Sequence, residues 1–160
     1  MLVGGLGAGC EPAAPQLVPY EALELPEDYG PEDATLTREQ VRLRSRILEV
    51  PDEVVLGDTL RYVVELANGS DAPVSLEPCP VYYQAYGESG FALSRTSHLN
   101  CDDAPPEIAS GAALKFEMEL PIEDREAVGV DGSIVWYLGA PDGELRQDVN
   151  VSGVVKVVAR

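Results

Sequence analysis

Basic residues are scarce in this 160-residue chain, which carries 11 Lys and Arg against 28 Asp and Glu, for a formal net charge of −17. Binding to nucleic acid needs clustered Lys and Arg to meet the phosphates, and docking on anionic lipid head groups needs them too. The charge therefore argues against both kinds of contact. Two interpretations of the acid excess stay open: it keeps the protein soluble, or it forms a surface for a cation or a basic partner.

Side chains that carry metal and nucleophile chemistry are also few, with one His, two Met and three Cys. That is too few ligands for a copper carrier or a catalytic zinc site. No GxGxxG, P-loop or nucleophile elbow is present. His98 has Ser97, Cys101, Asp102 and Asp103 close by in sequence, but a catalytic triad needs geometry that converges from separate elements. We expect an exposed loop histidine and a protein that is not an enzyme.

A calcium site is the one metal centre for which ligand types are available. Asp102, Asp103 and Glu107 could offer oxygens to Ca²⁺, which takes about six to eight of them. The spacing is not that of an EF-hand, and acidic loops are common in so acidic a chain. We expect no cofactor and no metal site, with calcium binding by these loops left open.

The first nine residues are small and apolar and lead directly to Cys10. They are too few to cross a bilayer, which takes roughly 20 residues. Leu6-Gly7-Ala8-Gly9-Cys10 resembles a lipobox, the end of a bacterial lipoprotein signal peptide, although no positive charge precedes it and Leu6 lies one position early. The resemblance implies that residues 1–10 are a truncated or atypical signal segment, with Cys10 lipidated and the protein held outside the cytoplasm. A glycine-rich N-terminus with an incidental cysteine is the alternative.

Residues 11–37 contain five prolines and seven acids but no Lys or Arg. Proline removes backbone donors and like charges repel, so this composition predicts an extended tether. Some residues are more apolar than a spacer requires, and part of the segment could dock on the domain or on a partner; these residues are Leu17, Val18, Tyr20, Leu23 and Leu25.

From Arg38 onward, short apolar-alternating runs separated by turn residues predict β-strands. Thr37 to Gln40 matches a helix capping box, so a helix over 37–49 competes with a strand, and we favour the strand from Arg42 on. Asn68-Gly69 predicts a hairpin between runs 60–66 and 74–76, and Gly87 to Gly90 predicts another between 81–86 and 91–93. Further runs lie at 114–120, 134–138, 149–151 and 154–158.

About seven to nine strands with turn signals every 8 to 12 residues are typical of an antiparallel β-sandwich, in which Trp136 would be a large core residue. Two stretches, Leu66 to Leu76 and Ile108 to Phe116, with the cysteine segments between them, resemble secreted, uncharacterised Ig-like domains of actinobacterial type. The resemblance covers roughly residues 42–138. It implies an Ig-like sandwich for residues 38–160, and it implies architecture only.

Cys79 and Cys101 remain to pair with each other if Cys10 is lipidated, and an exported protein is where such a pair would form. Closing this loop would stabilise the fold by roughly 3 kcal/mol on the chain-entropy model. A reactive or metal-binding pair and two unpaired buried thiols are the alternatives to this predicted disulfide.

Three tyrosines lie beside the cysteine segment, and Tyr82 and Tyr86 share a face if their run is a strand. Core packing and an exposed aromatic contact patch are both consistent with them, and we predict partner contact through Tyr82 or Tyr86. The function we predict is a non-enzymatic binding module anchored at the cell envelope, which contacts a protein or an envelope polymer. The alternatives are a proteinase-inhibitor-like domain acting through an exposed loop, and an accessory subunit of a membrane complex. The bacillus-type intracellular proteinase inhibitors share the layout.

Overall fold

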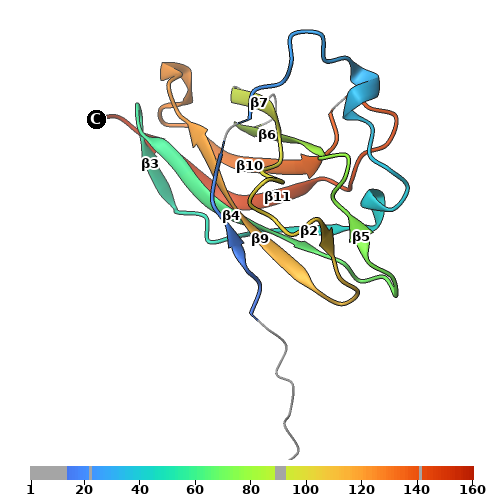
Figure 1. The fold of residues 1–160 in the computed structure, drawn as a ribbon. Coiled ribbons are helices and arrows are strands. Elements are labelled where there is room, and N and C mark those ends of the chain that lie inside the picture. Colours follow the sequence, from blue (N-terminus) through green and yellow to red (C-terminus); the bar gives the residue numbers. More distant parts are fainter. Residues whose placement is uncertain (1–13, 22, 89–92, 141) are drawn as a thin grey trace, which may run out of the picture.

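Strands that alternate buried and exposed side chains form two facing sheets in a computed structural model, which describes residues 14–21, 23–88, 93–140 and 142–160 (Figure 1). The first sheet has the strand order β1-β9-β4-β2 and the second has β3-β11-β10-β6-β7, beside a small β5-β8 pair. The strands are β1 (Leu17–Val18), β2 (Arg44–Leu48), β3 (Glu53–Val55), β4 (Thr59–Ala67), β5 (Val74–Ser75), β6 (Val81–Gly87), β7 (Leu93–His98), β8 (Glu107–Ile108), β9 (Ala113–Pro121), β10 (Asp131–Leu138) and β11 (Asn150–Val158). Short 3-10 helices are η1 (Pro31–Ala34), η2 (Gln40–Arg42) and η3 (Arg125–Ala127).

The strand neighbours are those of an immunoglobulin-like sandwich. In that fold, strands A, B and E are adjacent in one sheet and strands C, F and G in the other. Here β2, β4 and β9 are neighbours in one sheet, like A, B and E, and β6, β10 and β11 are neighbours in the other, like C, F and G. The predicted all-β, Ig-like sandwich is therefore confirmed.

The long strands of the first sheet show why the chain forms a sandwich. Antiparallel β4 and β9 pair in register from Thr59 opposite Pro121 to Ala67 opposite Ala113. Their even-numbered side chains are buried while the residues between them are more exposed, so one face meets the core and the other meets water. The buried residues are Leu60, Tyr62, Val64, Leu66, Leu114, Phe116, Met118 and Leu120.

Trp136 lies at the centre of the second sheet and is fully buried, as expected for the large residue of the core. Its ring stacks on that of Tyr82, with 5.8 Å between the ring centroids. The two residues come from neighbouring strands, because β10 pairs antiparallel with β6. The predicted hairpin that joins β6 to β7 is also present, with Tyr86 opposite Leu93, although residues 89–92 at its turn lie outside the described residues.

The predicted hairpin at Asn68-Gly69 is wrong. After β4 the chain does not return along the same sheet, because β5 pairs with β8. Asn68 is buried, and its amide nitrogen donates to the carbonyl oxygens of Ala72 (2.8 Å) and Ile108 (2.9 Å). Its side-chain oxygen accepts a hydrogen bond from the Ser70 backbone N–H. The asparagine holds the chain in place between strands instead of turning a hairpin.

The segment from residue 14 to 37 packs against the sandwich and is not a free tether. β1 adds to the first sheet by parallel pairing with β9, and Val18 is fully buried there. Ala34 and Leu36 are buried as well, and Leu23 forms a β-bridge with His98. The apolar residues of this segment dock because β9 would otherwise leave its outer edge unpaired. The domain therefore begins before the expected boundary at residue 38, and residues 11–13 lie outside the described part.

The strand that we favoured over a helix for residues 37–49 is present, and the capping box before it leads only to one short turn. The Thr37 hydroxyl accepts from the Gln40 N–H (3.1 Å) and the Gln40 side chain accepts from the Thr37 N–H (3.2 Å), which is the reciprocal pair of a capping box. It introduces only the single turn η2, and the strand β2 follows at Arg44.

The chain changes sheets between β2 and β3. β2 pairs antiparallel with β4 as far as Leu48 opposite Val63, and β3 then pairs parallel with β11 in the other sheet. At the crossover Glu49 has φ 51°, a left-handed conformation that is uncommon outside glycine. Because β2 leaves early, β4 residues 59–62 have no strand beside them on the β2 side in the described part of the chain.

Candidate functional site

The predicted disulfide between Cys79 and Cys101 is present, with an S–S distance of 2.04 Å and 5.9 Å between the Cα atoms. It joins the segment that enters β6 to the segment that leaves β7. The same two segments are held by a hydrogen bond from the Leu99 N–H to the Pro80 carbonyl (2.9 Å). The disulfide is part of the structural framework of the domain, and the sulfur atoms of both cysteines are engaged in it.

The predicted lipidation site, Cys10, lies outside the described residues. Within the described part, no helix has the length and apolar character needed to span a bilayer. The disulfide is compatible with a location outside the cytoplasm, where oxidising conditions preserve such bonds.

Tyr82 and Tyr86 are buried, so the prediction that they contact a partner is wrong. Their exposed fractions are 2% and 0%, because both face the core from β6. The Tyr86 hydroxyl lies 2.8 Å from the Val155 carbonyl oxygen and 2.9 Å from that of Val130. The prediction that Tyr82 and Tyr86 share one face of the strand is correct. That face is the buried one, so core packing, the other interpretation of these residues, is what the structure shows.

His98 is part of β7 and is half-buried, so it is not the exposed loop histidine that we expected. Its ring meets the edge of the Tyr29 ring at a centroid distance of 5.4 Å, and its Nδ1 is buried without a hydrogen-bond partner among the described residues. Cys101 is oxidised in the disulfide and cannot serve as a nucleophile beside it. The Asp103 carboxylate accepts from the Asn100 amide (2.9 Å). No group of three or more His, Cys, Asp or Glu suited to a metal ion occurs in the described ranges.

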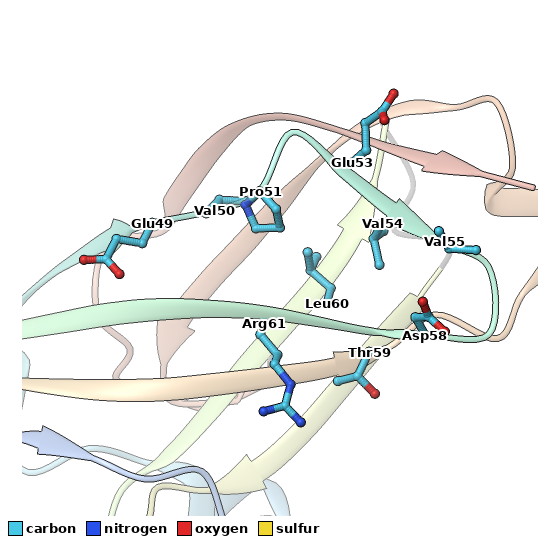
Figure 2. A pocket seen from close by; sticks show the side chains of 10 residues that line it. All are labelled: Glu49, Val50, Pro51, Glu53, Val54, Val55, Asp58, Thr59, Leu60 and Arg61. Atoms are coloured by element: carbon cyan, nitrogen blue, oxygen red, sulfur yellow. The ribbon is translucent and has the colours of Figure 1, made fainter. Parts of the chain in front are cut away.

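An open concavity lies where β2 leaves the first sheet, at the edge of the sandwich (Figure 2). We call it the edge groove, and it holds about 690 Å³ of accessible space. Figure 2 shows the side chains of Val54 from β3 and Leu60 from β4 facing one another between the two strands. The lining residues are Glu49, Val50, Pro51, Glu53, Val54, Val55, Asp58, Thr59, Leu60 and Arg61.

Unpaired backbone groups border the edge groove. The Asp58 carbonyl accepts from the Ile122 N–H, and the Asn68 N–H donates to the Ala112 carbonyl, so even-numbered residues of this run direct their backbone groups toward β9. Backbone groups of successive strand residues point to opposite sides, so Thr59 and Arg61 direct theirs toward the β2 side. β2 reaches only to Val63 on that side. The N–H and C=O groups of Thr59 and Arg61 therefore face the groove with no strand partner among residues 14–21, 23–88, 93–140 and 142–160.

Acidic side chains dominate the charge of the edge groove. Glu49 and Glu53 are exposed on its border. The cation among its lining residues that the structure describes is Arg61, which has one guanidinium nitrogen 2.9 Å from Glu119 and another 3.8 Å from Glu117 on β9. The groove thus combines an apolar floor, free backbone hydrogen-bonding groups and a negative border.

Sequence reasoning missed this site. Its residues belong to a strand, a crossover and a second strand that join different sheets, and each run alone has an ordinary β pattern. Pro51 and the short run 53–55 were the available signals, because a proline followed by so short a strand is typical of a sheet edge.

A second exposed apolar surface lies on the outer side of the second sheet. Three valines of the β11 region, Val149, Val151 and Val154, are 46%, 60% and 64% exposed. Val151 pairs with Val135 and Val154 with Ser133, with a register shift between them. We call these residues the β11 valines.

No protein-family model matches the chain, and no curated protein matches it. Among solved structures, the CARDB domain of the PF1109 protein from Pyrococcus furiosus, in complex with di-metal ions, is 14% identical with a TM-score of 0.45; 78% of this chain and 100% of that chain are covered. The alkylpurine DNA glycosylase AlkC of Pseudomonas fluorescens, bound to DNA with an abasic site analog, is 18% identical with a TM-score of 0.41, covering 70% and 30%. A Listeria innocua β-glucosidase in complex with isofagomine is 17% identical with a TM-score of 0.41, covering 74% and 16%. At these scores the likenesses support no conclusion about ligand or activity.

Proposed function

We propose that this protein is a non-enzymatic interaction module that is held outside the cytoplasm and binds another macromolecule. The observation that carries the proposal is the edge groove, a depression of about 690 Å³ bordered by acids and by β4 backbone groups that have no strand partner among the described residues. A strand edge with backbone groups that no neighbouring strand pairs is a template for another chain, and proteins that do not use such an edge usually block it.

The buried tyrosines support a role without acid–base chemistry. Burial raises the pKa of Tyr62 well above its usual value and raises that of Tyr82 as well. Both hydroxyls therefore stay protonated near neutral pH, and both side chains are buried in the core. Perturbed pKa values often mark catalytic sites, but here desolvation in a packed core accounts for them.

The anchor we propose is a lipid on Cys10, and the packing of β1 fixes how far it could reach. Seven residue steps separate Cys10 from Leu17, which span at most about 25 Å. Because the chain from residue 14 onward is part of the domain, the sandwich would sit close to the membrane surface instead of standing clear of it.

Two measurements on the native protein test this proposal. The intact mass from the membrane fraction should correspond to a chain that starts at a diacylated Cys10 and gains about 2 Da on reduction of the disulfide. An unmodified Met1 with three free thiols would contradict the location outside the cytoplasm. A photo-crosslinking residue placed at Val55 or Val151 should then form a specific crosslink in the intact envelope, whereas one at Asp71 should not. Absence of crosslinks from both Val55 and Val151 would remove the interaction function.

A further inference from the structure

We propose that the edge groove binds an extended peptide segment of a partner protein, in which apolar residues alternate with basic ones, as an added strand beside β4. This inference rests on the proposed interaction function and names the site and the chemistry of the partner. Extended peptides join exposed sheet edges through main-chain hydrogen bonds, and pockets for alternate side chains select the sequence.

The backbone of β4 supplies the docking edge. Thr59 and Arg61 each turn an N–H and a C=O toward the side that β2 vacates, as the alternation with Asp58 requires. A peptide bound there would continue the line of β2 beyond Leu48. It would complete the first sheet where the described chain leaves it open.

The side chains of the edge groove select what such a strand carries. Alternate residues of an added strand would point inward over Val50, Val54 and Leu60, which form an apolar floor. Val54 and Leu60 are 7% and 0% exposed, so the apolar lining that a peptide can touch comes mainly from Val50, Pro51 and Val55. Aliphatic side chains of the peptide are therefore expected at the inward positions.

The outward residues of the strand would meet negative charge. Glu49 and Glu53 line the groove, while Arg61 is neutralised by Glu119 and Glu117. Lys or Arg at the outward positions complement this border. A second copy of the chain is a poor occupant, because each copy carries a formal charge of −17 and the copies repel.

The first test uses a short, fluorescein-labelled synthetic peptide of alternating valine and lysine, with a valine and glutamate peptide of equal length as its control. Fluorescence anisotropy should show binding of the lysine peptide alone. Amide hydrogen exchange followed by NMR should show protection of Thr59 and Arg61 in the complex. Binding of both peptides, or binding with no change at these two amides, would overturn the proposal.

Two pairs of variants localise the contact. Thr59→Pro removes one edge donor and should weaken binding roughly three- to tenfold, while Thr59→Val keeps the N–H and should bind as the parent does. Glu53→Lys should weaken binding roughly threefold at low salt and less at high salt, while Asp71→Lys makes the same charge change on a distant exposed loop and should have little effect. If Thr59→Pro fails to fold, the Glu53 pair still decides the matter.

The outcomes separate this inference from the proposed function. A native partner that crosslinks at Val55 and is displaced by the valine and lysine peptide supports both. A partner that crosslinks at Val151 and is unaffected by Glu53→Lys would leave the interaction function in place and overturn the edge groove as its site.

Discussion

Adding a single carbon atom at Gly132 tests how tightly the core side of the second sheet is packed. A Cβ at this position would lie 2.6 Å from Cζ of the Tyr86 ring and 2.8 Å from its hydroxyl oxygen. The Tyr86 ring has no space to rotate away, because it is fully buried and its hydroxyl lies within hydrogen-bond distance of the carbonyl oxygens of Val155 and Val130. Overpacking costs about 1–3 kcal/mol, and disturbing a buried hydroxyl adds about 1 kcal/mol. Gly132→Ala should therefore destabilise the protein by about 2–4 kcal/mol, which lowers Tm by roughly 5–15 °C.

Urea unfolding followed through the fluorescence of Trp136, the single tryptophan, measures this effect directly. Gly153→Ala on β11 is the matched control, since a Cβ there meets nothing within 4 Å and its φ is not in the left-handed region. It should change stability by no more than about 0.5 kcal/mol. A Gly132→Ala protein that unfolds within about 0.5 kcal/mol of the parent would refute the reasoning, because the Tyr86 ring would then have room to move.

The remaining predictions concern the disulfide, the buried tyrosines and the crossover. Replacing Cys79 and Cys101 together by Ala should cost about 3 kcal/mol in urea unfolding, since they enclose a loop with a sequence separation of 22, and unchanged stability would contradict a stabilising bond. Because burial raises the pKa of Tyr62 and Tyr82, the native state keeps protons that the unfolded state releases above about pH 10. Stability should be full below that pH and fall above it by up to about 1.4 kcal/mol per pH unit for each tyrosine, with a shallower slope in Tyr62→Phe. Glu49→Gly should be neutral or stabilising, while Glu49→Val should cost about 1–2 kcal/mol, because a β-branched residue does not tolerate φ 51°. Thermal unfolding measures the difference, and equal Tm values for both variants would count against that conformation.

Local patterns in the sequence were sufficient for the strands that carry their own signal. The alternation at 114–120 fixed β9 and its buried face, because period two matches the pleat of a half-buried strand. The cysteines gave the disulfide for a different reason, since few pairings are possible with three of them. The same kind of local evidence failed at Asn68-Gly69, where the turn residues suit a hairpin equally well but the chain crosses to β8.

Tyr82 and Tyr86 show the limit of strand periodicity. Alternation told us that they share a face, and it could not tell us that the face is the core. That choice depends on the opposite sheet and on Trp136, which stacks on Tyr82 from the neighbouring strand. The N-terminal segment is a similar case. Its prolines and acids predict a tether, and its apolar residues indicate that part of it could dock, but only the open edge of β9 shows where Val18 packs.

Residue types and their spacing along short runs were enough to predict the fold class, the disulfide, the acid excess and most strand positions. Which faces are buried, where the N-terminal segment lies and where the edge groove opens depend on how distant segments pack against one another. The groove exists because β2 pairs with one sheet and β3 with the other, which leaves Thr59 and Arg61 without a strand on the β2 side in the described part of the chain. Such a vacancy is a property of pairing between distant segments, and no local pattern records it.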